Sequence, residues 1–111
     1  MTFDAGDVVV VPFPFTDRVA AKRRPALVLS QDESFGAAGH GVMAMIISAR
    51  HSRWPLDVEI VDRQSAGLTV PCLVRMKLFT LDHRFVERRM GRLGSADRAN
   101  VTKALSALLT I

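Results

Sequence analysis

Three consecutive cations stand where a polar connection meets an apolar run. Lys22, Arg23 and Arg24 directly precede Pro25, and residues 26–29 are all apolar. A residue before proline is biased towards extended backbone, so Arg24 is expected at the start of a strand. A guanidinium held in this way presents a fork of donors that fits two phosphate oxygens. The segment is a candidate phosphate contact, although a solvated loop whose cations aid solubility would show the same residues.

A hydroxyl and another cation follow a different apolar run. Residues 42–47 are apolar throughout, and Ser48 ends the run two residues before Arg50. Residues two apart on an extended chain share a face, so this hydroxyl and this cation would approach a phosphate from two sides. A serine that merely caps a strand is the commoner arrangement, and the residues alone leave both interpretations open.

The chain is basic, with a formal net charge of +4 and a pI near 10.2. Of its 15 cations, 12 are arginine. Arginine is better suited than lysine to bidentate phosphate contact and to stacking on bases, which favours a nucleic acid over a generic acidic surface. Twelve of the 15 lysines and arginines fall in four groups: Arg18 with residues 22–24, Arg50 with Arg53 and with His51 between them, Arg75 with Lys77, and Arg84 with Arg88, Arg89 and Arg92.

Several other chemistries lack support in the sequence. The three histidines, at 40, 51 and 83, do not show metal-ligand spacing, and there is no glycine-rich phosphate loop, so neither a metal nor a cofactor is expected. The single cysteine, Cys72, lies in an apolar run and is expected to be a small core residue in a reducing compartment. No run reaches the roughly 18 apolar residues of a membrane span. The N-terminus does not resemble a signal peptide, so we expect a cytoplasmic protein without membrane association.

Hydrophobic patterning predicts one domain over residues 1–111, built mainly from strands. The run 42–48 is apolar on both faces, which is typical of a central strand. Pro12 and Pro14 remove ladder donors and place the end of the first strand at an edge or bulge. The expected strands lie at roughly 7–13, 25–31, 42–48, 56–62, 72–80 and 88–93.

The C-terminal segment is expected to be a helix. Ser95 fits an N-cap, and Asp97 falls in the first turn. The residues that recur at helical spacing and would form one buried stripe are Val101, Ala104, Leu105, Leu108 and Leu109. The predicted fold class is therefore mainly β (α+β), a compact antiparallel sheet closed by a C-terminal helix.

Three segments carry a resemblance to a known family. Residues 6–17 read GDVVVVPFPFTD, residues 22–29 read KRRPALVL, and residues 67–82 read GLTVPCLVRMKLFTLD. Together they resemble the MazF/PemK family of toxin–antitoxin ribonucleases, and the likeness covers about residues 5–110. The resemblance implies an SH3-like barrel of the CcdB/MazF type.

The resemblance also implies roles for individual residues. Arg24 falls on the arginine of the family's Arg-Pro element and Ser48 on the hydroxyl that works with it, so these two are the expected catalytic pair. Arg50 stands where glutamine is commoner. Lys77 stands where an acidic residue is frequent, and this departure suggests an altered base preference. The residues expected to contact RNA are Arg18, Lys22, Arg23, Arg50, Arg53, Arg75, Lys77 and Thr80.

The mechanism hypothesised for this pair uses the nucleophile that RNA carries, its 2′-hydroxyl. A protein then has to align that hydroxyl, stabilise extra charge on the phosphate and move protons. Arg24 would stabilise the charge, because arginine is a poor base, and Ser48 would donate a hydrogen bond to the phosphate or orient the 2′-hydroxyl. The expected cut needs no metal and leaves a 2′,3′-cyclic phosphate and a 5′-hydroxyl, as the resemblance also implies.

The resemblance implies a homodimer that cleaves single-stranded RNA (mRNA, tRNA or rRNA) and is silenced by an antitoxin. The antitoxin's acidic, partly disordered tail would imitate the phosphate chain in a basic groove. Two alternatives remain open. A CcdB-like DNA gyrase inhibitor would use a C-terminal Trp-Gly-Ile, whereas this chain ends in Leu109, Thr110 and Ile111 and has its only tryptophan at position 54. A barrel that binds RNA or protein without cutting is the other.

Overall fold

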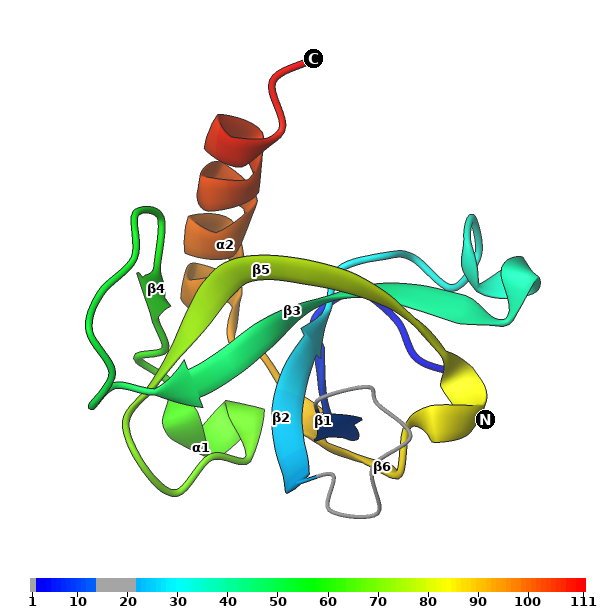
Figure 1. Cartoon of the computed structure of the whole chain (residues 1–111), viewed down its shortest axis with the longest axis horizontal. Coiled ribbons are helices and arrows are strands. Elements are labelled where there is room, and N and C mark those ends of the chain that lie inside the picture. The colour runs from blue at the N-terminus through cyan, green and yellow to red at the C-terminus, as the bar shows by residue number, and fades with distance from the viewer. Residues whose placement is uncertain (1, 14–21) are drawn as a thin grey trace.

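The computed structural model describes residues 2–13 and 22–111, which form a curled antiparallel sheet with a helix on one side (Figure 1). In chain order the strands are β1 (Asp7–Phe13), β2 (Lys22–Val28), β3 (His40–Ser48), β4 (Val58–Glu59), β5 (Cys72–Asp82) and β6 (Arg88–Arg92). They pair in the order β4-β5-β3-β2-β1-β6. The helices are η1 (Gly36–Ala38), α1 (Arg63–Ala66), η2 (His83–Phe85) and the C-terminal α2 (Ser95–Leu108). The predicted fold class is confirmed, and β3 is a central strand as expected.

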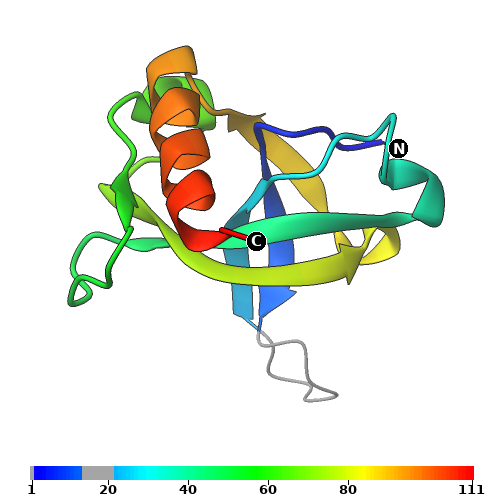
Figure 2. The ribbon, with the colours of Figure 1, turned by 90° about the horizontal axis from the view of Figure 1, so that it is seen from above.

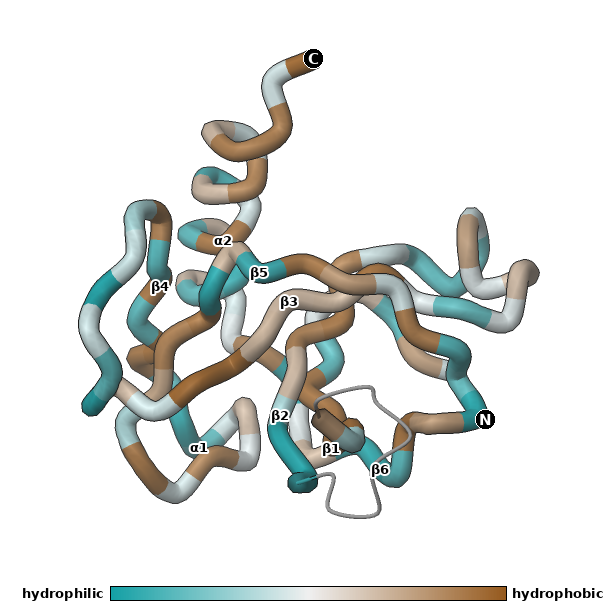
Figure 3. Tube along the Cα trace, viewed as in Figure 1, coloured by the Kyte–Doolittle hydropathy of each residue, from teal (hydrophilic) through white to brown (hydrophobic). Residues whose placement is uncertain are grey.

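The central strands are apolar on both faces because each face meets its own core. Val8 and Ile46 belong to the cluster that packs against α2, whereas Val9, Val11 and Met43 belong to a second cluster on the other face. Figure 2 shows α2 lying across one side of the sheet, and Figure 3 shows apolar segments along β1, β3 and β5. Burying one such side chain fully stabilises the fold by roughly 1.5–3 kcal/mol relative to leaving it exposed.

The second strand begins and ends earlier than the predicted range of 25–31. Lys22 pairs with Phe13 and Arg24 pairs with Val11, so the basic residues belong to the strand itself. Pairing of β2 with β3 begins only after Pro25, the residue that has no N–H to donate. The cations of β2 are therefore fixed on regular backbone.

The strand predicted at 56–62 is wrong for most of its length, since only Val58–Glu59 is extended and paired. Leu56 has a positive φ of 69°, which interrupts the strand before it. After it, the Val61 amide donates to both carboxylate oxygens of Asp97 at 3.1 Å instead of to a neighbouring strand. The alternating pattern in this segment therefore comes from two buried residues of a loop, and not from one face of a long strand.

The C-terminal helix differs from the prediction at both ends. Its N-cap is Gly94 in extended conformation, so the prediction of Ser95 as the cap is wrong. Val101 and Ala104 are buried as expected, but Leu108 and Leu109 are 39% and 64% exposed because the last turn projects beyond the sheet (Figure 1). In the described part of the chain, no helix combines the length and apolarity needed to cross a membrane.

Candidate functional site

Arg24 and Ser48 line the same cavity, which has a volume of about 330 Å³. Antiparallel pairing brings the start of β2 beside the end of β3, and the cavity lies at this junction. We call it the Arg24–Ser48 cavity. Its lining includes Phe13, Arg24, residues 45–48, His51, Val70 and Cys72.

Arg24 is held on rigid backbone but its side chain is exposed. Its Cα is in register with Val11 of β1, and Pro25 follows it. Within residues 2–13 and 22–111, no carboxylate forms an ion pair with its guanidinium. An arginine placed in this way keeps its fork of donors available for an anion.

Ser48 organises the turn that follows β3. Its Oγ accepts a hydrogen bond from the Arg50 amide at 3.3 Å, and its carbonyl oxygen accepts one from the His51 amide at 3.2 Å. The Ala49 amide donates to the carbonyl oxygen of Pro71 at 2.9 Å, which ties the turn to the segment before β5. The capping role considered from the sequence is therefore present. Because the Oγ accepts from the turn, its own O–H remains a donor for an anion in the cavity.

A second cavity, of about 380 Å³, adjoins the first and shares Ser48 and Val70 with it. Arg50, Ala49 and Pro71 complete its lining. Val70 is 53% exposed and stands between the two cavities. The two hollows together form a surface with Arg24 in one part and Arg50 in the other.

Lys77 lies next to the Arg24–Ser48 cavity, because its ammonium group contacts an aromatic ring that lines the cavity. Its Nζ lies 5.5 Å from the centroid of Phe13, which lines the cavity. A bulge in β5 explains this position, because β3 residue Ala44 pairs with Leu78 while the next residue pairs with Arg75. The side chain is exposed, so its ammonium group adds positive charge beside the cavity.

Arg75 occupies a different environment from the other predicted contacts. Its guanidinium pairs with Asp57 at 2.9 Å, donates to the Ser52 carbonyl oxygen at 2.7 Å, and lies 4.4 Å from the centre of the Trp54 ring. The Arg75 and Asp57 side chains are only 10% and 2% exposed. Burial acts to raise the pKa of Asp57, but hydrogen bonds from Arg75 and the Trp54 amide outweigh it and lower this pKa. These contacts make Arg75 a positioning residue for the loop between β3 and β4, and its predicted contact with RNA stays a prediction.

The sequence profile of the PemK-like, MazF-like toxins of type II toxin–antitoxin systems matches residues 4–109. The chain belongs to this toxin family. No curated protein sequence matches it significantly. The resemblance seen in residues 6–17, 22–29 and 67–82 is thereby confirmed.

Solved structures of MazF-like proteins share the fold. MazE-MazF (Form-III) from Deinococcus radiodurans is 26% identical with a TM-score of 0.79, over 100% of this chain and 99% of that one. An endoribonuclease in complex with its cognate antitoxin from Mycobacterial species has a TM-score of 0.76 at 15% identity, over 96% and 93% of the two chains. The Mycobacterium tuberculosis toxin MazF-mt6 has a TM-score of 0.73 at 17% identity, over 91% and 93%. At these lower identities the likeness shows the fold alone.

The remaining predicted contacts that the structure describes in this MazF-like chain line neither of the two cavities. Lys22 and Arg53 are exposed, and Arg23 forms an exposed ion pair with Glu87 at 2.6 Å. Thr80 is exposed on β5 beside Val42 and lines neither cavity. Arg18 lies outside the described residues.

Two further lining residues of the Arg24–Ser48 cavity matter for its chemistry. Cys72 is 4% exposed, and burial raises the pKa of its thiol, which agrees with the prediction of a core cysteine. His51 is exposed and lines the cavity, although the sequence analysis counted it only as a member of a basic group. The sequence feature that could have indicated this position is the spacing of three residues between Ser48 and His51, which is the length of one tight turn.

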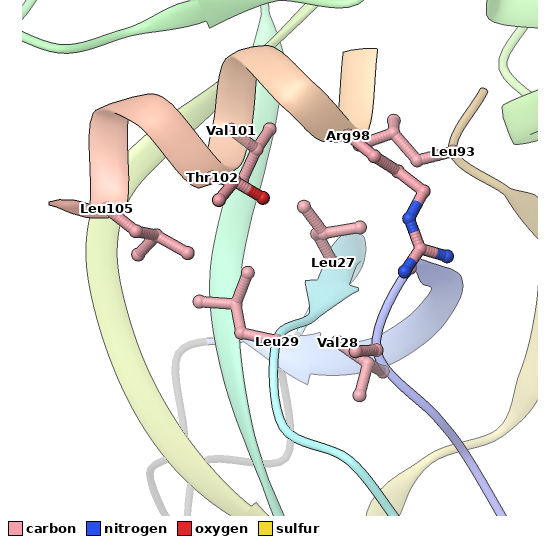
Figure 4. A pocket seen from close by; sticks show the side chains of 10 residues that line it. Leu27, Val28, Leu29, Leu93, Arg98, Val101, Thr102 and Leu105 are labelled. Atoms are coloured by element: carbon pink, nitrogen blue, oxygen red, sulfur yellow. The ribbon is translucent and has the colours of Figure 1, made fainter. Parts of the chain in front are cut away.

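A smaller cavity, of about 70 Å³, lies under α2 and is separate from this site. Figure 4 shows Leu27, Leu29, Val101 and Leu105 around it, with the Arg98 guanidinium at one side. It is mainly apolar and too small for a nucleotide. Among residues 2–13 and 22–111, no cluster of three His, Cys, Asp or Glu side chains could hold a metal ion.

Proposed function

We propose that this toxin is a metal-independent endoribonuclease that cleaves single-stranded RNA at short specific sequences. The observation that carries the proposal is the shared cavity of Arg24 and Ser48. Membership of the MazF-like toxin family and the likeness to an endoribonuclease fold support it. Family membership favours it over gyrase inhibition, and the cleavage assay described below distinguishes it from a barrel that binds without cutting.

In the proposed reaction, the scissile phosphate lies between Arg24 and Ser48. The 2′-hydroxyl of the preceding ribose attacks phosphorus, the bond from phosphorus to the 5′-oxygen breaks, and a 2′,3′-cyclic phosphate remains. Arg24 stabilises the charge that develops on the phosphate oxygens, and the Ser48 hydroxyl donates to one of them or orients the nucleophile. Donors fixed before the reaction stabilise such charge without reorganising during it.

The first test is the chemistry of the cut ends. Purified protein is expected to cleave single-stranded RNA equally well in EDTA and in Mg²⁺, because a guanidinium supplies the charge that a metal would supply. The products should carry a 2′,3′-cyclic phosphate and a 5′-hydroxyl, identified by mass spectrometry. RNA binding without cleavage would contradict the proposal, and so would inhibition of gyrase supercoiling in its place.

The second test concerns the charge around the two cavities. RNA carrying 2′-deoxy substitutions, which blocks cleavage, is expected to bind with an affinity that falls steeply as salt rises, because bound cations are released. Lys77→Ala should weaken binding and reduce the slope of log K against log salt by about 0.7, the value for one phosphate contact on a single strand. Lys103→Ala, an exposed lysine on α2, should change neither quantity. An unchanged slope for Lys77→Ala would remove this residue from the RNA path.

The proposed assembly is a homodimer held inactive by an antitoxin with an acidic tail. A basic surface with Arg24, Arg50 and Lys77 suits a peptide whose carboxylates imitate phosphates. The MazE-MazF structures from Deinococcus radiodurans and the endoribonuclease bound to its cognate antitoxin support such a partner. Sedimentation at micromolar concentration tests the dimer, and competition between an acidic peptide and RNA tests the shared surface.

A further inference from the structure

We propose that His51 is a catalytic residue that donates a proton to the 5′-oxygen leaving group. The inference rests on the proposed ribonuclease function and adds the proton donor that Arg24 and Ser48 do not supply. Breaking the bond from phosphorus to the 5′-oxygen leaves an alkoxide, which is a poor leaving group unless it is protonated. Arginine is always charged and a poor acid, and a serine hydroxyl holds its proton tightly.

The position of His51 follows from the turn after β3. The Ser48 carbonyl oxygen accepts from the His51 amide, and the turn is tied to the carbonyl oxygen of Pro71 through Ala49. These bonds fix the backbone of His51 beside the cavity, and His51 lines this cavity together with Arg24 and Ser48. Its side chain is exposed, so it exchanges protons with solvent between turnovers.

The ionisable groups around His51 come from three parts of the fold. Arg24 faces the cavity from β2 and Cys72 from β5, and Arg50 and Arg53 lie in the same loop as the histidine. The burial that raises the Cys72 pKa keeps this thiol protonated, so it is not an anionic partner for the imidazole. Histidine is the side chain that ordinarily gains and loses its proton between about pH 5 and 8.

The proton transfers balance over one turnover. The 2′-oxygen forms a bond to phosphorus and loses its proton to water, while the 5′-oxygen leaves with the electron pair of its bond and takes a proton from the imidazolium. The neutral imidazole then regains a proton from solvent. No oxidant, reductant or metal is consumed, and the RNA is divided without loss of atoms.

The test pairs a histidine variant with a changed leaving group. His51→Ala and His51→Gln are expected to lower the single-turnover rate on ordinary RNA by about a hundred-fold or more, as loss of a general acid does. On RNA with sulfur in place of the scissile 5′-oxygen, the variants should cleave nearly as fast as wild type, because a thiolate leaves without a proton. On ordinary RNA, the ratio of the wild-type rate to the variant rate should also become smaller as pH rises through the range in which an imidazolium loses its proton.

Controls separate this inference from the proposed function. His40→Gln removes a histidine whose Nδ1 contacts the Ala38 carbonyl oxygen away from the cavity, and it should cleave both substrates like wild type. Arg24→Ala should be slow on both substrates, because charge stabilisation is needed for either leaving group. An equal defect of His51→Ala on both substrates, or no defect on ordinary RNA, overturns the role of His51 while cleavage that depends on Arg24 still stands. Failure of the wild-type protein to cleave either substrate overturns the proposed function and this inference with it.

Discussion

Replacing Arg24 with alanine is expected to lower the kcat for RNA cleavage by about 100- to 1000-fold, the usual cost of losing one fixed donor to a transition-state charge. The side chain is exposed and has no ion-pair partner in the described residues, so the fold should tolerate its removal. Single-turnover cleavage of a short RNA measures the effect, and circular dichroism checks that the variant is folded.

Two further variants sharpen this result. Arg24→Lys keeps the positive charge but loses the two-pronged contact, so it should recover only part of the rate. Arg84→Ala removes an arginine that is 84% exposed and paired with Asp82 near η2, and its rate should match wild type. Wild-type cleavage by Arg24→Ala would show that the cavity is not the reaction site.

Replacing Arg75 with alanine is expected to reduce the free energy of unfolding by about 3–5 kcal/mol, because it leaves the Asp57 carboxylate buried without its partner. A domain is commonly stable by only about 5–15 kcal/mol, so this is a large share. Urea unfolding measures it. Adding Asp57→Asn to Arg75→Ala should recover part of the loss, since the stranded charge is then gone.

The pH dependence of this pair has a defined sign. The pKa of Asp57 is lowered in the folded protein. The contribution of the pair to the free energy of unfolding is therefore fully present above the ordinary pKa of 3.8. It is lost as pH falls through the lower folded value. The difference in stability between wild type and Arg75→Ala should therefore shrink in acid. Arg84→Ala is the exposed control and should hardly change the stability. A similarly small effect for Arg75→Ala would contradict its positioning role.

The sequence predicted those parts of the fold in which one local pattern dominates. Residues 42–48 are apolar on both faces, and this indicates a strand with cores on either side without reference to any distant residue. Arg24 was placed correctly at a strand because the backbone restriction before Pro25 is local. The convergence of Arg24 and Ser48 on one cavity follows once β2 and β3 pair as neighbours.

The errors arise where a distant partner decides the structure. Val61 was assigned to a strand because its segment alternates, but its amide binds Asp97 of α2. Leu109 was assigned to a buried stripe, but the sheet ends before the helix does. The sequence also did not indicate that Asp57 and Trp54 contact the Arg75 guanidinium, and the predicted contact of this residue with RNA stays a prediction. None of these partners is visible in the spacing of neighbouring residues.

In the proposed reaction, the substrate's own 2′-hydroxyl attacks the phosphate bound at the Arg24–Ser48 cavity. The most direct measurement replaces that single hydroxyl by hydrogen in the nucleotide before the cleaved bond and follows cleavage at this position. Cleavage there is expected to stop, while the modified RNA still binds and still competes with unmodified RNA. Continued cutting at the deoxy position would contradict the account, because the nucleophile would then come from elsewhere.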